Sequence, residues 1–219
     1  MELEMLQVSQ DSDGIRYHFT ASFSEGIHLL SGSDASAKTL LLSLLTGKNA
    51  PDHGEIRFLG YDIMALGRAY QNHLAYFSRF PLFPDSFTLS HYLIYTGILQ
   101  RLEPDQARGK ASSLIRRFGL ENFAGQTLGE LPGAIKKRVL LANTLHSEAP
   151  VLLLDKPFTY ASADDLDWMF PHLLKLRERK IILMSVEREH LMDRIPHRTL
   201  YLENGTILPE ACLREKTPV

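Results

Sequence analysis

The sequence has almost no cysteine and no long apolar run. Its single cysteine, Cys212, cannot form a disulfide within the chain, which excludes a disulfide-stapled secreted domain and fits a reducing compartment. No apolar run approaches the roughly 20 residues that a membrane-spanning helix needs. Residues 1–4, Met-Glu-Leu-Glu, are acidic where a signal peptide carries positive charge. We therefore expect a cytoplasmic protein, which a partner would hold at any membrane where it works.

The sequence also lacks an excess of charge of either sign. It has 24 Lys and Arg residues against 26 Asp and Glu residues, a formal net charge of −2. Such a balance leaves no electrostatic footprint for nucleic acid, so no nucleic-acid partner is expected. The short basic runs at 116–117 and 136–138 are typical of solvated helix faces.

What the sequence does contain is an alternation of apolar strands and helices. Its hydrophobic content of 44% is enough to bury a substantial core. Apolar runs and period-two patterns predict strands at residues 3–9, 15–19, 27–30, 55–59, 72–77, 151–154 and 181–184. Helical spacing predicts helices at 38–46, across 88–128, at 139–146 and at 164–179. Strand-helix-strand units of this kind predict an α/β fold with a mainly parallel sheet covered by helices.

The long helical stretch divides the predicted chain. Residues 88–128 are expected to form a helical subdomain, and residues 1–87 and 129–219 to form the core on either side of it. Within the core, the first thirty or so residues read as strands joined by turns. One domain with a smaller embedded subdomain follows from this division.

The stretch from Gly32 to Thr39 has the context of a phosphate-binding loop, because it follows a strand and opens a helix. Gly32, Lys38 and Thr39 stand where the pattern G-x-x-x-x-G-K-[ST] requires them, and Ala37 stands at the second glycine. In that pattern backbone N–H groups surround the phosphates, the lysine neutralises them and the threonine hydroxyl ligates Mg²⁺. A lysine and a threonine at a helix start are also typical of ordinary helices, so the stretch alone decides nothing. The candidate nucleotide-binding residues are Gly32, Ser33, Asp34, Ala35, Ser36, Ala37, Lys38, Thr39 and Leu40.

Three further motifs follow in order along the chain. They are P-D-H-G-E-I at 51–56, L-P-G-A-I-K-K-R at 131–138 and L-L-L-D-K-P at 152–157. Together with the loop, they resemble the ABC transporter ATP-binding family over nearly the whole chain. That family typically has G-P-N-G-A-G-K-T-T-L-L, P-D-S-G-E-I, the signature L-S-G-G-[QM]-x-[RK]-R and the Walker B segment L-L-L-D-E-P.

The resemblance implies both a fold and a set of partners. The fold is a P-loop NTPase of ABC type, with a mainly parallel sheet core, an N-terminal antiparallel β subdomain and an inserted α-helical subdomain. The cofactors are ATP and Mg²⁺, with Thr39 and Asp155 as the metal-binding residues. The partners are a membrane permease subunit and a second ATP-binding domain, in a homodimer or in a heterodimer with an intact ABC ATPase. The chain would then lie at the inner face of the membrane.

The catalytic positions depart from the family pattern. Lys156 occupies the place of the glutamate that activates water, and a protonated amine cannot accept a proton. Glu187 stands at the switch histidine and would repel a γ-phosphate. Arg79 stands where a glutamine or glutamate contacts the metal and the membrane partner, and a cation cannot ligate Mg²⁺. We assign no catalytic residue, and we expect Lys156 and Glu187 either to pair with each other or to stay solvated in an unused cleft.

The binding motifs depart as well. Ala35 and Ala37 replace two glycines of the loop, and each Cβ would cost roughly 1–2 kcal/mol if the loop needed positive φ there. In the signature Pro132 replaces the serine that donates a hydroxyl to the opposite nucleotide, and Ala134 replaces the second glycine. No aromatic residue stands at the usual adenine-stacking position, and the nearest, Tyr17, is expected to face the sheet. The signature residues are Leu131, Pro132, Gly133, Ala134 and Ile135.

Three functions stay open at this point. The favoured one is a degenerate, catalytically impaired ATP-binding subunit, a pseudo-ATPase, that docks on a permease through residues 79–84 and the helical subdomain. The second is a slow but active ATPase in which Asp164 or Asp165 serves as the base. The third is a soluble regulatory protein derived from the family.

Overall fold

The computed structural model describes residues 1–78, 84–159, 163–186, 193–208 and 215–216, without the side chains of residues 163–165, 168 and 215–216. The chain forms two compact units. The first unit comprises residues 1–78 and 148–219, and the second comprises residues 79–147. In the second unit the helices of 88–128 are joined by one more helix, α6 (Gly133–Leu145).

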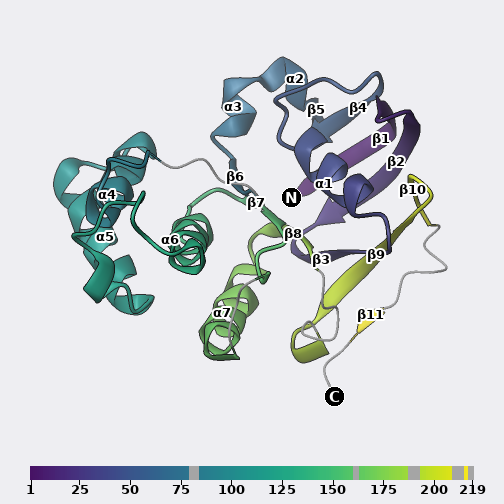
Figure 1. The fold of residues 1–219 in the computed structure, drawn as a ribbon. Coiled ribbons are helices and arrows are strands. Elements are labelled where there is room, and N and C mark those ends of the chain that lie inside the picture. Colours follow the sequence, from purple (N-terminus) through teal and green to yellow (C-terminus); the bar gives the residue numbers. More distant parts are fainter. Residues whose placement is uncertain (79–83, 160–162, 187–192, 209–214, 217–219) are drawn as a thin grey trace. The chain divides into compact units, whose positions relative to one another are not determined.

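The first unit is built on an eleven-stranded sheet with the order β5-β4-β1-β2-β10-β9-β3-β8-β7-β6, and β11 pairs with β9 (Figure 1). One part of it is antiparallel, since β1 pairs with both β2 and β4, and β4 with β5. The other part is parallel, since β3 pairs with β8 and β9, and β7 with β6 and β8. The strands are β1 Glu2–Ser12, β2 Ile15–Ser24, β3 Gly26–Ser31, β4 His53–Phe58, β5 Tyr61–Asp62, β6 Leu74–Phe77, β7 Val151–Asp155, β8 Ile181–Ser185, β9 His197–Glu203, β10 Thr206–Ile207 and β11 Glu215–Lys216.

Two of the parallel strands, β7 and β8, are the most deeply buried of the described strands. Every residue of β7 and of β8 is buried, as the continuous apolar runs of their sequences predict for strands that are covered on both faces. The antiparallel strand β2 instead alternates buried and exposed residues over its first half, the pattern of a strand with one solvated face. The predicted α/β fold with a mainly parallel core is confirmed.

The P-D-H-G-E-I segment is a structural turn that leads into β4. Gly54 has φ +79, and a Cβ there would lie 2.3 Å from the carbonyl oxygen of Gln7. Only glycine therefore allows β4 to lie this close to β1 at its bulge. This motif builds the β subdomain and contributes no chemical group.

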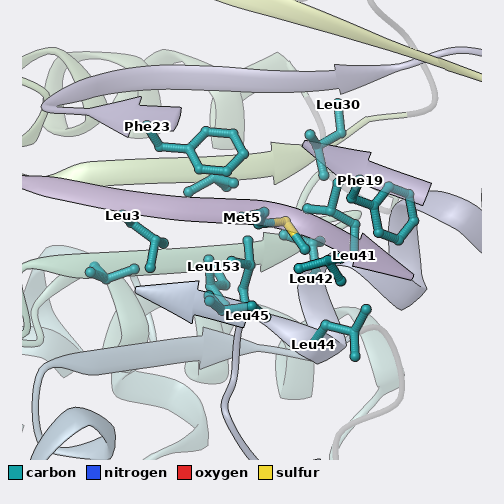
Figure 2. Packing of buried hydrophobic residues seen from close by; sticks show 14 of the residues in the cluster. Leu3, Met5, Phe19, Phe23, Leu30, Leu41, Leu42, Leu44, Leu45 and Leu153 are labelled. Carbon is teal, nitrogen blue, oxygen red and sulfur yellow. The ribbon is translucent and has the colours of Figure 1, made fainter. Parts of the chain in front are cut away.

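Helix α1, Ala35–Leu44, follows β3 and supplies much of the core. It buries Leu41, Leu42 and Leu44 in a cluster with residues of β1, β2, β3 and β7, and Figure 2 shows these side chains with others of the cluster, among them Leu153. A fully buried leucine contributes roughly 1.5–3 kcal/mol, so this helix is held firmly to the sheet. The other helices of the first unit are α2 Ile63–Leu66, α3 Arg68–Gln71 and α7 Ala163–Leu176.

The second unit is helical. It contains α4 Leu89–Leu99, α5 Pro104–Arg117, the 3-10 turn η1 Glu121–Phe123 and α6 Gly133–Leu145. Helix α4 packs on α5, and the Thr96 hydroxyl on α4 donates to the Asn143 side chain on α6 over 3.2 Å. Among the described residues, none of the helices is long and apolar enough to span a membrane.

Two predicted helices begin earlier than their sequences indicate. The helix predicted over 38–46 begins at Ala35, and the one predicted over 139–146 begins at Gly133. In the second case Pro132, with φ −55 and ψ 145, is the N-cap, so the helix begins directly after it. Both shifts fall on candidate functional motifs.

Candidate functional site

The carboxyl ends of the parallel strands bring the candidate residues of the first unit together. In the sheet register Leu30 of β3 lies opposite Ser185 of β8, and Asp155 of β7 lies opposite the same Ser185. The turn at Gly32 and Asp155 therefore lie at the same edge of the sheet, on either side of β8. In open parallel sheets this edge is where ligands bind.

The turn after β3 requires glycine. Gly32 has φ +104, and a Cβ there would lie 2.0 Å from the carbonyl oxygen of Leu202 on β9. No side chain fits at that distance, and the positive φ is itself unfavourable for other residues. The glycine that opens the phosphate-loop pattern is thus fixed by packing against the neighbouring strand.

Helix α1 begins inside the predicted loop. Asp34 is its N-cap, with extended backbone angles, and its Oδ1 accepts a hydrogen bond from the Ala37 N–H over 2.8 Å. The Lys38 N–H donates to the carbonyl oxygen of Asp34 over 3.3 Å. Two N–H groups at the start of the helix are therefore already bonded to Asp34.

The strain considered for Ala35 and Ala37 is absent. Both residues belong to α1, and neither is among the non-glycine residues with positive φ. Alanine has the highest helix propensity and aspartate is among the best N-caps, so Asp34 and the alanines together favour a helix that starts early. The alanines change the loop by making it helical.

Lys38 is directed back onto the loop. Its side chain is only 6% exposed, and its Nζ donates to the Gly32 carbonyl oxygen over 2.7 Å. Because Gly32 is fixed against β9, this bond ties the start of α1 to the end of β3. The ammonium group thus lies at the loop, as the motif requires.

Asp155 is the centre of a buried polar group. It is 1% exposed; its Oδ1 accepts from the Ser185 hydroxyl over 2.7 Å and its Oδ2 accepts from the Thr39 hydroxyl over 3.2 Å. Ser185 is fully buried and in turn accepts from the Lys156 N–H over 2.9 Å. Hydrogen-bond partners of this kind are what a buried carboxylate needs to be tolerated in a core.

These contacts test whether Mg²⁺ and a nucleotide fit the site. A carboxylate and a hydroxyl in contact are oxygen ligands of the kind that Mg²⁺ binds, together with phosphate oxygens and water. Thr39 and Asp155 therefore fit the metal. The phosphate cradle does not fit in the same way, because two of its N–H groups are bonded to Asp34.

Lys156 lies where the resemblance predicts the general base. It follows β7 directly, is 7% exposed and has φ +51, a conformation that costs a non-glycine residue roughly 1–2 kcal/mol. Its carbonyl oxygen accepts from the Thr159 hydroxyl over 3.0 Å, which closes the turn after the strand. The residue after Asp155 is thus buried, has a positive φ and carries an amine.

Tyr76 on β6 borders the same edge of the sheet. Burial raises the pKa of its hydroxyl, and the negative charge of Asp155 raises this pKa further, while a hydrogen bond with Ser78 partly offsets them. Sequence patterns did not single out Tyr76 or Ser185 for this site, because their role depends on the strand order. Only the register β6-β7-β8 brings both residues to Asp155.

Several predicted site residues lie outside the described residues. They are Arg79 and Glu187, together with the side chains of Asp164 and Asp165. The pairing of Lys156 with Glu187 therefore stays a prediction. Tyr17 is described, and it lies in the hydrophobic core, stacked with Phe19 at 6.2 Å between ring centroids, so it offers no face to an adenine.

The signature segment belongs to the second unit. Leu131 is buried, whereas Pro132, Gly133 and Ala134 are exposed at the start of α6. Pro132 carries neither the hydroxyl nor the backbone N–H that a serine would supply there. Ile135 is partly buried in the first turn. The exposed tip of the motif is thus a helix start without a side-chain cap.

Comparison with known proteins agrees with this arrangement. The sequence profile of the ABC transporter family matches residues 18–159. The Nod factor export ATP-binding protein I of Burkholderia thailandensis is 29% identical over 203 residues, which are 92% of this chain and 66% of that protein. A thiamine import ATP-binding protein of Jannaschia is 27% identical over 222 residues, 98% of this chain and 94% of that protein. The chain spans just under two thirds of the first of these relatives.

Solved structures share the fold. The ATP-binding subunit of an ABC transporter superposes with a TM-score of 0.85 at 18% identity, covering 98% of this chain and 90% of that one. A dimeric ATP-binding cassette bound to ADP and Pi superposes with a TM-score of 0.80 at 17% identity, covering 98% and 99%. The chain belongs to the ABC transporter ATP-binding family and has its P-loop ATPase fold.

Proposed function

We propose that this chain is an ATP-binding subunit of an ABC transporter whose own catalytic site is impaired, and that it acts as a coupling partner on a membrane permease. The single observation that carries this proposal is Lys156. It occupies the buried position directly after Asp155, where the family needs a carboxylate to activate water.

The chemistry of that position opposes hydrolysis. A lysine side chain ends in an ammonium group, which donates hydrogen bonds and has no acceptor, where a base must accept a proton. Water activation by the family mechanism is therefore absent from this chain. The sheet, the turn at Gly32 and the Asp155 contacts keep the frame that such a site needs.

The relatives suggest the partners. They are named as ATP-binding proteins of Nod factor export and of thiamine import, and one solved cassette is described as dimeric. By analogy, this chain would dock on a permease at the inner face of a membrane and pair with a second copy or with an intact ATPase.

The docking face we propose is the helical region together with the segment around Arg79. In the second unit Tyr95, Ile98 and Leu99 of α4 are exposed large apolar side chains. Scattered exposed apolar residues are ordinary, but these three lie on one turn and a half of the same helix and offer a contact surface. Arg79 precedes this helix in the chain, outside the described residues.

A slow ATPase is the second candidate. Lys38, Thr39 and Asp155 keep the contacts of a metal and phosphate site, which favours it. Its base would be a carboxylate from the start of α7, Asp164 or Asp165. This alternative predicts turnover that depends on Lys38.

Single-turnover phosphate release tests the proposal. The purified chain, in excess over Mg-ATP, is compared with Lys38→Ala, which removes the loop ammonium. We expect the two proteins to release phosphate at the same background rate. Release by the natural chain that Lys38→Ala abolishes would establish the slow ATPase instead.

A further inference from the structure

We propose that Asp34 is an internal occupant of the phosphate loop: its carboxylate holds the place of a phosphate at the start of α1 and keeps nucleotide out. This inference rests on the proposed function, because it explains how the same site is restrained. It concerns binding, whereas the substitution at Lys156 concerns hydrolysis.

The hydrogen bonds of the loop carry the argument. In a phosphate loop the N–H groups at the start of the helix point at the ligand. Here the Ala37 N–H donates to the Asp34 carboxylate over 2.8 Å, and the Lys38 N–H donates to the Asp34 carbonyl over 3.3 Å. One residue thus satisfies, with side chain and backbone, donors that a phosphate would need.

The charge of Asp34 has the same effect. The N-terminus of a helix carries a partial positive charge that favours an anion. The Asp34 carboxylate already supplies this anion, so an approaching phosphate would meet a like charge and fewer free donors. Neutral capping residues would fill the cap without this repulsion.

The arrangement can open without disturbing the core. Ser33, Ala35 and Ser36 are exposed, and Asp34 is only partly buried, so its side chain can rotate away while Leu41 and Leu42 stay packed. Gly32 on one side and the buried part of α1 on the other stay fixed. The Asp34 side chain therefore blocks the loop locally, while the strand and helix on either side of the loop keep their positions.

The chain offers a matched pair of variants. Asp34→Asn keeps an oxygen that can accept from the Ala37 N–H and removes the charge. Asp62 is a second N-cap in the same unit, accepting from the Met64 N–H over 3.0 Å at the start of α2. Asp62→Asn therefore makes the same chemical change at a helix that belongs to the other end of the sheet, next to β5.

The experiment is calorimetric titration with ATP, first in EDTA and then with Mg²⁺. We expect Asp34→Asn to bind ATP at least about tenfold more tightly than the natural chain, because like charges at a binding site oppose association. Asp62→Asn should bind as the natural chain does. A folded Asp34→Asn that binds no more tightly than the natural chain overturns the proposal.

Two further readings keep the result decisive. If Asp34→Asn loses its thermal transition, Asp34→Ser replaces it, since serine caps helices and has no charge. Phosphate release separates the two proposals. If Asp34→Asn binds ATP more tightly and the natural chain also releases phosphate, the impaired catalytic site is rejected and the role of Asp34 stands. If Asp34→Asn binds no more tightly and the natural chain releases no phosphate, the role of Asp34 is rejected and the impaired catalytic site stands.

Discussion

The two halves of the site, the end of β7 and the start of α1, are held in different ways. At the end of β7, Asp155, Lys156 and Ser185 are buried and joined by hydrogen bonds, so each change there affects the folded core. At the start of α1, Ser33, Ala35 and Ser36 are exposed, and the Asp34 side chain caps the helix beside them. Substitutions at the start of α1 can therefore alter binding with a small loss of stability, whereas substitutions at the end of β7 must fit the buried core.

Some residues of the site have structural roles that do not depend on any reaction. Gly32 and Asp155 are retained with roles that the fold itself needs, as a close packing point and as the acceptor of two hydroxyl bonds. Part of a family motif can thus be required by the fold itself, apart from the chemistry that the motif supports.

The largest effect is expected for Gly32→Ala. Its Cβ would lie 2.0 Å from the Leu202 carbonyl, so β9 or the loop must shift, and we expect a loss of about 3 kcal/mol in the free energy of unfolding. Gly14→Ala is the matched control: its φ is +77 but nothing lies within 4 Å of the new Cβ, so it should lose only about 1 kcal/mol. Urea denaturation measures both, and equal losses would contradict the packing role.

Asp155→Ala should follow closely. It leaves the buried hydroxyl of Ser185 and the hydroxyl of Thr39 without their acceptor, at an expected cost of about 2–3 kcal/mol. Asp155→Asn keeps one acceptor oxygen and should cost less. A difference below about 0.5 kcal/mol between the natural chain and Asp155→Ala would show that the carboxylate is not part of the core.

Asp34→Ala should have a smaller effect on stability. It removes an N-cap hydrogen bond at an exposed helix start, which costs about 1 kcal/mol, while Asp34→Asn should cost a few tenths. Both are measured by urea denaturation beside Asp155→Ala. If Asp34→Ala destabilises the chain as much as Asp155→Ala, the contrast between the two regions fails.

The pH dependence of stability reports on the buried side of β3. Burial lowers the pKa of His28 below its ordinary value of 6.5, the hydrogen bond from its Nε2 to the Ser24 carbonyl partly offsets this, and Arg198 lowers it further. The unfolded chain then binds a proton more readily than the folded one. The contribution of His28 is complete above pH 6.5 and is lost as the pH falls through the lowered folded pKa.

His28→Gln is the control for this effect. It removes the titrating group from β3, so the decline in the urea midpoint below pH 6.5 should become smaller. An identical decline in the variant and the natural chain would place the proton uptake elsewhere.

The parallel core was predictable from the sequence because its strands are continuous apolar runs. The strands β9, β10 and β11 were not predicted. In β9, polar residues such as His197 and Thr199 stand among the apolar ones, and the sequence does not show that these two are buried in the folded chain. The short elements β5, α2 and α3 were also not predicted, and they have too few residues to show a period.

The site was predictable in part. The motif pattern indicated Gly32, Lys38, Thr39 and Asp155, and the structure brings Thr39 to Asp155. The position where α1 begins could not be predicted, because it depends on competition between a loop conformation and the cap of Asp34, which a pattern does not weigh. The strain considered for the alanines depended on that loop conformation and is absent.

Calorimetric titration with Mg-ATP, of the natural chain and of Lys38→Ala, decides whether the loop of this chain binds nucleotide. We expect no saturable binding below millimolar ATP in either protein, because the Asp34 carboxylate occupies the loop. Micromolar binding that Lys38→Ala abolishes would contradict this expectation and would make the chain an ATP-gated subunit.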